Sequence, residues 1–152
     1  MPADDTISNP DLENAAITKA AIAVEDLPQL IANSPIATLF NTRMGPSHPG
    51  YAEVIVPIVD TILQHRGIVN GAVLGFIADT ACCMAAATKV GDVRTQEYKI
   101  NFIAPAMGQE LVGKGSVIGS SFSQVIARAD IFARNNDNEY LVATALATLY
   151  KM

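Results

Sequence analysis

One carboxylate, Asp79, stands near the middle of an almost wholly apolar stretch that runs over residues 67–87. An ionised carboxylate in apolar surroundings must find partners, or its pKa rises. If this stretch is a helix, only uncharged residues lie one turn away, and none of them can pair with the carboxylate: Gly75, Phe76, Cys82 and Cys83. We therefore expect its partner to be a remote side chain, a ligand or water, as for a nucleophile or general base beside a cleft.

The same stretch opens with Asn70-Gly71, which is typical of a helix start. An Asn side chain caps a helix, and Gly presents an unobstructed N–H where the helix has unsatisfied donors and a positive dipole end. These features predict an oxyanion site. Asp79 lies eight positions after Gly71, or about 12 Å along a helix. The two can border one substrate channel without touching, and a partner chain would complete the site.

Two other interpretations of the stretch stay open. A membrane-spanning helix needs about 20 lipid-compatible residues, and a central Asp costs about 3 kcal/mol. The run is also rich in Ala, Gly and Cys rather than Leu, so we expect no membrane span. In a plain core helix, Asp79 would be a structural carboxylate bonded to a backbone group or a lysine.

Composition indicates one globular domain in a chain of 152 residues. Hydrophobic residues make up 50% and charged residues 16%, a surplus of apolar residues that often ends in a subunit interface. The net charge is −5 and no Lys/Arg cluster occurs, which argues against nucleic-acid binding. The start of the chain is acidic and polar, unlike a signal peptide, so we expect an intracellular, cytoplasmic protein.

The only cysteines, Cys82 and Cys83, are sequence neighbours. Neighbouring cysteines do not form an ordinary intrachain disulfide, and they lack the spacing of metal ligands. We expect two small packing residues, and neither a metal nor an organic cofactor.

The order of the predicted elements indicates an α+β fold. A capped helix is expected over residues 10–24, two short helical pieces over 26–33 and 34–41, and then a loop, "MGPSHPGY". Alternation from Tyr51 indicates a strand that Pro57 closes. Four antiparallel strands are expected after the long apolar helix, over residues 94–104, 110–118, 122–133 and 140–151. One sheet wrapped around the helix would explain why the helix is apolar nearly all round.

The segment "LQHRGIVNGAVLGFIADTA" resembles the signature of hotdog-fold acyl-CoA thioesterases of the phenylacetic-acid-degradation type. In that family a Gln or Asn lies six residues before a His-Gly-Gly turn, and an Asp or Glu follows nine residues after the His. These spacings fall on Gln64, Asn70 and Asp79 here. "RTQEYKINFIAPA" resembles the strand after the family's helix, and "SPIATLF" with "PGYAEVIVP" resembles the start of its domain. The likeness covers about residues 34–150.

The resemblance implies a hotdog fold: a long central helix wrapped by a five- to six-stranded antiparallel sheet, over residues 34–152. Residues 1–33 would be an N-terminal helical extension, either a cap over the acyl pocket or a packing arm. Such proteins form homodimers with active sites shared at the interface, often as dimers of dimers. The substrate would be the acyl-CoA of a medium-size acyl or aryl group, hydrolysed without a cofactor.

The resemblance also assigns roles at the reacting bond. Asp79 would attack the thioester carbonyl or activate water, and the Gly71 N–H would polarise that carbonyl. Gln64 would border the thioester or the water, and Thr95 occupies a position where relatives place a hydroxyl from the neighbouring subunit. Cys83 would line the pocket. The residues expected to border the CoA portion are Phe102, Ala104, Pro105, Gly119, Ser120 and Ser121.

Two departures from the family pattern bear on activity. The usual His is Asn70 here, and the second Gly is Ala72. Asn can donate a hydrogen bond and cap the helix, but it cannot carry a proton. His65 is either a substitute base or the holder of a structural hydrogen bond. The alternative function is therefore a non-catalytic acyl-CoA binding or sensing protein of the same fold.

Overall fold

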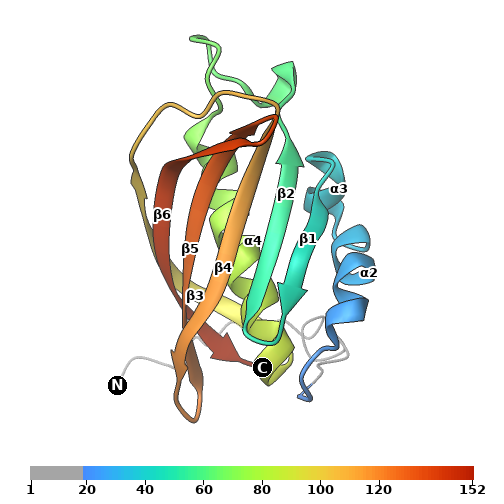
Figure 1. The fold of residues 1–152 in the computed structure, drawn as a ribbon. Helices are drawn as coiled ribbons and strands as arrows, with labels where there is room; N and C mark the ends of the chain where they lie inside the picture. The colour runs from blue at the N-terminus through green and yellow to red at the C-terminus, as the bar shows by residue number, and fades with distance from the viewer. Residues whose placement is uncertain (1–18) are drawn as a thin grey trace, which may run out of the picture.

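The computed structural model describes residues 19–152, and in it six strands form one antiparallel sheet with a long helix packed against one face (Figure 1). The strands lie in the order β1-β2-β4-β5-β6-β3. This is the α+β hotdog arrangement predicted from the sequence. The elements in chain order are η1 (Val24–Asp26), α2 (Leu27–Ala32), α3 (Pro35–Leu39), β1 (Arg43–His48), β2 (Tyr51–Pro57), η2 (Asp60–Ile62), α4 (Gly71–Val90), β3 (Val93–Phe102), β4 (Glu110–Ser120), β5 (Gln124–Asn135) and β6 (Asn138–Lys151).

The helix α4 begins and ends where its sequence provides caps. Asn70 Oδ1 accepts a hydrogen bond of 2.9 Å from the Ala72 N–H, which satisfies one of the donors that the first turn leaves free. At the other end Gly91 adopts a φ of 83°, a conformation that L side chains rarely adopt. These caps limit α4 to the segment that the sheet covers.

Two glycines of β4 let α4 approach the sheet closely. A Cβ atom at Gly113 would collide with Ile77, and one at Gly115 would collide with the backbone of Ala81. The inner faces of the strands fill the rest of the interface with buried aliphatic side chains such as Leu111. Helix and sheet therefore share one core, and close backbone packing fixes the position of α4.

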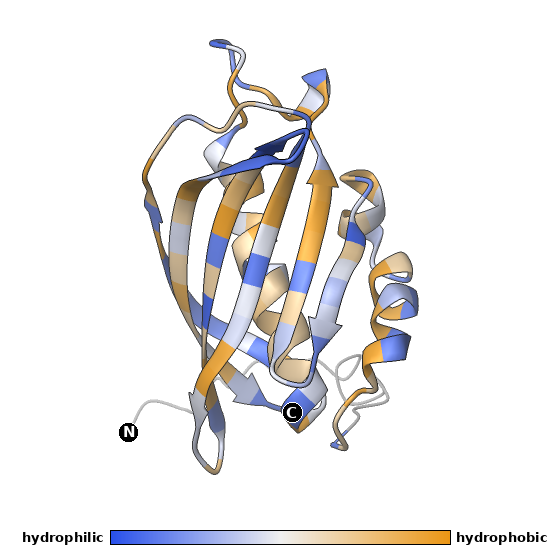
Figure 2. Ribbon diagram, viewed as in Figure 1, coloured by the Kyte–Doolittle hydropathy of each residue, from blue (hydrophilic) through white to orange (hydrophobic). Residues whose placement is uncertain are grey.

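α4 is apolar along its length and lies in the core of this fold (Figure 2). By length and composition the helix could cross a membrane, yet 61% of its most apolar window is buried inside the protein. A helix that is apolar nearly all round and covered by a sheet is typical of a protein core. The burial therefore supports the core interpretation of the stretch.

The two short helical pieces expected near the start of the chain are confirmed as α2 and α3. The expected helix over 10–24 falls mostly outside the described residues, and its described end, 19–23, is not helical. In that end the Ile22 N–H donates to the Ala87 carbonyl at 2.9 Å. The backbone thus bonds to the last turns of α4 instead of to itself, which is why this part of the prediction is wrong.

The expected loop "MGPSHPGY" is also wrong, because most of it belongs to β1. This strand pairs antiparallel with β2 at the edge of the sheet, and its register shifts between Met44 and Ser47. Pro46 lies within that irregularity. Proline is tolerated at an edge strand or a bulge, because no ladder hydrogen bond is lost there. The Gly and Pro residues that indicated a loop therefore mark a bulged edge strand.

Candidate active site

Asp79 on α4 and Thr95 on β3 form the centre of the site. The Thr95 hydroxyl donates a hydrogen bond of 2.5 Å to Asp79 Oδ1, and both side chains are half-buried. None of the ion pairs among the described residues involves Asp79. The remote partner expected for this carboxylate is thus a neutral hydroxyl of the same chain. A second copy is not needed to bring this hydroxyl to Asp79.

A bulge in β3 aims Thr95 at the helix. The register between β3 and β6 shifts between Thr95 and Glu97. After the shift, the even-numbered residues of β3 face α4. Tyr98 is one of them, because a Cβ atom added at Gly75 of α4 would lie 2.8 Å from the Tyr98 hydroxyl. A bulge changes which side chains point to which face of a sheet. It therefore lets Thr95 and Tyr98, three residues apart, both face α4.

Cys83 lies one turn beyond Asp79 and completes a small polar group. Its sulfur is 3.9 Å from Asp79 Oδ1 and 3.3 Å from Thr95 Oγ1. Burial, and then the nearby Asp79 carboxylate, raise the pKa of the Cys83 thiol to about 12. The protonated thiol is a weak donor toward the carboxylate. The expectation that no residue one turn away can pair with Asp79 is thus corrected for Cys83.

Asp79 and Cys83 open into a pocket of about 400 Å³ between α4 and the short N-terminal helices. Its walls are mainly apolar, and it is large enough for a small organic group. The lining residues are Leu30, Ile31, Ser34, Ile36, Phe76, Asp79, Thr80, Cys83, Met84, Ala87, Asp92 and Val93. We call this cavity the Asp79 pocket.

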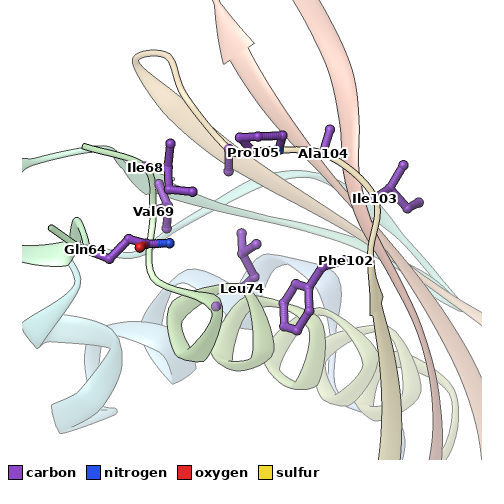
Figure 3. A pocket seen from close by; sticks show the side chains of 10 residues that line it. Gln64, Ile68, Val69, Leu74, Phe102, Ile103, Ala104 and Pro105 are labelled. Atoms are coloured by element: carbon purple, nitrogen blue, oxygen red, sulfur yellow. The ribbon is translucent and has the colours of Figure 1, made fainter. Parts of the chain in front are cut away.

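A second pocket of about 360 Å³ lies at the start of α4, and we call it the Gly71 pocket (Figure 3). The Phe102 ring lies over the first turns of the helix, and the Gln64 side chain projects into the pocket from the loop before it. A Cβ at Gly71 would be 3.2 Å from Phe102 Cζ. Its lining residues are Gln64, Ile68, Val69, Gly71, Leu74, Phe102, Ile103, Ala104, Pro105 and Ala106.

The donor at Gly71 is free for a ligand. Asn70 Oδ1 is occupied by the Ala72 N–H, whereas the hydrogen bonds of residues 19–152 include none from the Gly71 N–H. As the first residue of α4, Gly71 stands at the positive end of the helix dipole. The Gly71 pocket thus offers a backbone N–H that suits a carbonyl oxygen or an oxyanion.

The structure groups some of the predicted residues and separates others. Gln64, Gly71, Phe102, Ala104 and Pro105 share the Gly71 pocket, whereas Asp79 and Cys83 share the Asp79 pocket, with Thr95 bonded to the carboxylate. Within one chain, the single substrate channel expected between Gly71 and Asp79 is therefore divided into two separate pockets. The remaining predicted residues line neither of them: Asn70, which caps α4 beside Gly71, His65 in the exposed loop before α4, and Gly119, Ser120 and Ser121 at the β4–β5 turn.

Sequence reasoning left residues 1–33 as either a cap over the acyl pocket or a packing arm, and it named none of the α2 and α3 residues that line the Asp79 pocket. Leu27, Leu30 and Ile31 recur at helical spacing and mark an apolar face of α2. That spacing was the available signal for a packed wall. No group of three or more His, Cys, Asp or Glu side chains in residues 19–152 is arranged to hold a metal ion.

The chain resembles known thioesterases in sequence and in fold. Residues 66–140 match the sequence profile of the Thioesterase superfamily. A thioesterase family protein from Silicibacter pomeroyi is 26% identical, with a TM-score of 0.78 over 83% of this chain and 95% of that one. None of the curated proteins matches the chain.

Two further solved structures share the fold at lower identity. A thioesterase from Haemophilus influenzae is 20% identical, with a TM-score of 0.74 over 88% of this chain and 93% of that one. The PaaI protein of the phenylacetic acid degradation operon of E. coli is 17% identical, with a TM-score of 0.75 over 84% and 91% of the two chains.

Proposed function

We propose that this protein, which belongs to the hotdog-fold thioesterase superfamily, hydrolyses acyl-CoA thioesters of a medium-size acyl or aryl group. Asp79 supports the proposal most directly. Its carboxylate is half-buried in a mainly apolar pocket and bonded to the Thr95 hydroxyl, with no ion pair to any described residue. A carboxylate in that setting is suited to attack a carbonyl or to accept a proton from water.

Two routes lead from this arrangement to the free acid and CoA. In one, an Asp79 oxygen bonds to the acyl carbon, the C–S bond breaks, and water then hydrolyses the resulting anhydride. In the other, Asp79 takes a proton from a water molecule whose oxygen attacks the acyl carbon, and the thiolate leaves with a proton. The Thr95 hydroxyl orients the carboxylate in both.

The Gly71 N–H is the proposed donor to the carbonyl oxygen, on which negative charge develops in either route. Backbone donors at a helix start are fixed before the reaction, and loss of one such donor commonly lowers kcat by about 10²–10³. Gln64 lines the same pocket and is the proposed contact to the thioester or the water. Asn70 acts on the reaction indirectly, because its side chain holds the first turn of α4.

A second copy of the chain would bring the two pockets together. β3 is at the edge of the sheet and pairs only with β6 among the described strands, and Phe102 near its end is 58% exposed. Antiparallel pairing of β3 with its copy would set the two α4 helices in opposite directions, with the Gly71 pocket of one chain near Asp79 of the other. We therefore propose a homodimer with shared active sites, assembled further into a dimer of dimers.

The remaining parts of the proposal follow the same chemistry. The domain comprises residues 34–152, with residues 1–33 as an N-terminal extension. The protein acts in the cytoplasm, on CoA esters and not on nucleic acids. The Asn at position 70, where relatives carry His, favours one alternative: a protein that binds acyl-CoA without turning it over.

Comparison of the wild type with Asp79→Asn on a panel of acyl-CoAs tests the function. Free thiol release is the readout, and the variant keeps the size of the side chain while removing its charge. We expect hydrolysis by the wild type and a loss of about a hundredfold or more in the variant. Equal rates would exclude the catalytic role of Asp79. Tight binding of acyl-CoA without turnover would support the binding protein instead.

A further inference from the structure

We infer that the acyl group is a linear aliphatic chain of medium length, and that α2 and α3 form the wall that selects it. The inference rests on the proposed hydrolysis at Asp79. It concerns a part of the chain before residue 66, where the match to the family profile begins. Three properties of the Asp79 pocket support the inference: its shape, the residues that line it, and the contacts that hold its walls in place.

The α4 side of the pocket is a single stripe along the helix. Its residues recur at helical spacing, from Phe76 through Asp79 and Cys83 to Ala87. Eight residues from Asp79 to Ala87 correspond to about 12 Å along the helix axis. The cavity is therefore an elongated groove that leads away from the reacting carboxylate.

The opposite side of the groove comes from the N-terminal helices. Leu30 and Ile31 of α2 line it together with Ile36 of α3. Ile31 is 4% exposed and Ile36 is 51% exposed, so the wall passes from the core to the mouth of the groove. These three side chains are aliphatic, and Ser34 is the one polar residue of this wall. The wall therefore suits methylene groups better than a polar acyl substituent.

Two contacts hold this wall against α4. Leu27 of α2 is fully buried and packs with Ala52 and Ala85. The Ile22 N–H, just before α2, donates to the Ala87 carbonyl at 2.9 Å. The groove therefore has a fixed width, set by packing and by a backbone hydrogen bond, rather than the variable width of a loose arm.

The length of the groove favours a chain over a ring. An extended chain advances about 3.5 Å for every three bonds, so about 12 Å takes roughly ten carbons. A single aromatic ring would fill only the part nearest Asp79. Asp92 and Val93 follow the C-terminal end of α4 and also line the groove, and a carboxylate at that end disfavours further methylenes.

The first measurement is a series of saturated acyl-CoAs from acetyl to palmitoyl, with phenylacetyl-CoA alongside, followed by free thiol release. Each methylene buried in the groove should raise kcat/KM by about fourfold, with no further gain beyond roughly ten carbons. Decanoyl-CoA should therefore exceed both butyryl-CoA and phenylacetyl-CoA. A flat profile, or a preference for phenylacetyl-CoA, would overturn the inference even where hydrolysis occurs.

Two variants test the walls. Ala87→Leu fills the far end and should lower kcat/KM for decanoyl-CoA about tenfold more than for butyryl-CoA. Ile36→Asp places a charge at the exposed mouth of the groove, where folding tolerates it. This variant should also lower kcat/KM more for decanoyl-CoA than for butyryl-CoA. Leu39→Ala is the matched control, because Leu39 is an exposed α3 residue outside the groove. An unaltered chain-length profile in both variants would refute the proposed wall.

Binding of free decanoate, measured by calorimetry, separates this inference from the proposed function. If the wild type releases no thiol from any ester, the proposed hydrolysis fails. Decanoate binding that Ala87→Leu abolishes and Leu39→Ala retains would still support the groove. Absence of decanoate binding to a wild type that hydrolyses no ester would overturn both.

Discussion

The Thr95 hydroxyl on β3 donates a 2.5 Å hydrogen bond to the Asp79 carboxylate on α4. The two elements meet at this point because β3 bulges between Thr95 and Glu97. A hydroxyl that donates to a carboxylate fixes its rotamer. The pair thus presents an oriented anion to the Asp79 pocket without an ion pair beside it.

Removal of this hydroxyl should slow the reaction without unfolding the protein. Thr95→Val keeps the shape of the side chain but loses a hydrogen bond to a charged group, which corresponds to a fall in kcat of about tenfold to a hundredfold. Thr95→Ser restores the donor and should recover most of the rate. Steady-state kinetics on one acyl-CoA checks both variants. A Val variant with wild-type kcat would contradict the orienting role.

Gly71→Pro should remove the proposed oxyanion donor while preserving the helix. Proline suits the first helical position, and Asn70 already has the extended ψ of 135° that a residue before proline requires. We expect kcat to fall by about 10²–10³, with the urea unfolding midpoint close to that of the wild type.

Gly71→Ala is the matched control for the proline variant. Its added Cβ would be 3.2 Å from the edge of the Phe102 ring, which is 58% exposed and free to move. The N–H is kept, so kcat should stay within a few-fold of the wild type. Equal losses in both variants would show that crowding, not the donor, limits turnover.

The thiols of the buried Cys82 and the half-buried Cys83 should resist alkylation in the folded protein. Burial raises the pKa of Cys82 and of Cys83 to about 12 in each case, from an ordinary value of 9.0. Because the thiolate is the reactive form, iodoacetamide at about pH 8 should modify both residues only after unfolding in urea. Rapid alkylation of the native protein, detected by mass spectrometry, would contradict this.

The same pKa shift predicts how stability depends on pH. A folded-state pKa above the unfolded value of 9.0 means that the folded protein keeps a proton which the unfolded chain releases. The stability that the protonated Cys83 thiol contributes to the folded state is fully present below about pH 9 and is lost as the pH rises toward about 12. The free energy of unfolding should therefore fall more steeply above pH 9 for the wild type than for Cys83→Ser, which has no thiol to ionise at this position.

Much of the fold was predictable because its signals are local. Alternating apolar residues marked the strand from Tyr51, and Asn70 marked the start of a helix whose apolar surface requires a covering sheet. β1 was missed because its Gly and Pro residues have the composition of a loop. Only pairing with β2 shows that they lie in an edge bulge.

The sequence pointed to candidate site residues but not to their geometry. Spacing along one helix pointed to Asp79 and Gly71, since both lie on α4. The bond from Thr95 depends on a β3 bulge, which reflects pairing with β6 and leaves no mark in the β3 sequence. The division into two pockets, and the wall at Leu30 and Ile31, depend on how distant segments pack.

Asn70 can be tested for two roles at once, as a helix cap and as a neighbour of the proposed oxyanion. Asn70→Ala loses the 2.9 Å bond from the Ala72 N–H and should lower the free energy of unfolding by about 1 kcal/mol. Asn70→Asp should keep the cap and gain from the helix dipole. Its negative charge beside the Gly71 N–H should nevertheless lower kcat by about tenfold or more. Urea unfolding and kcat measured on the same samples separate the two effects. An Asp variant as active as the wild type would show that no negative charge develops at the start of α4 during the reaction.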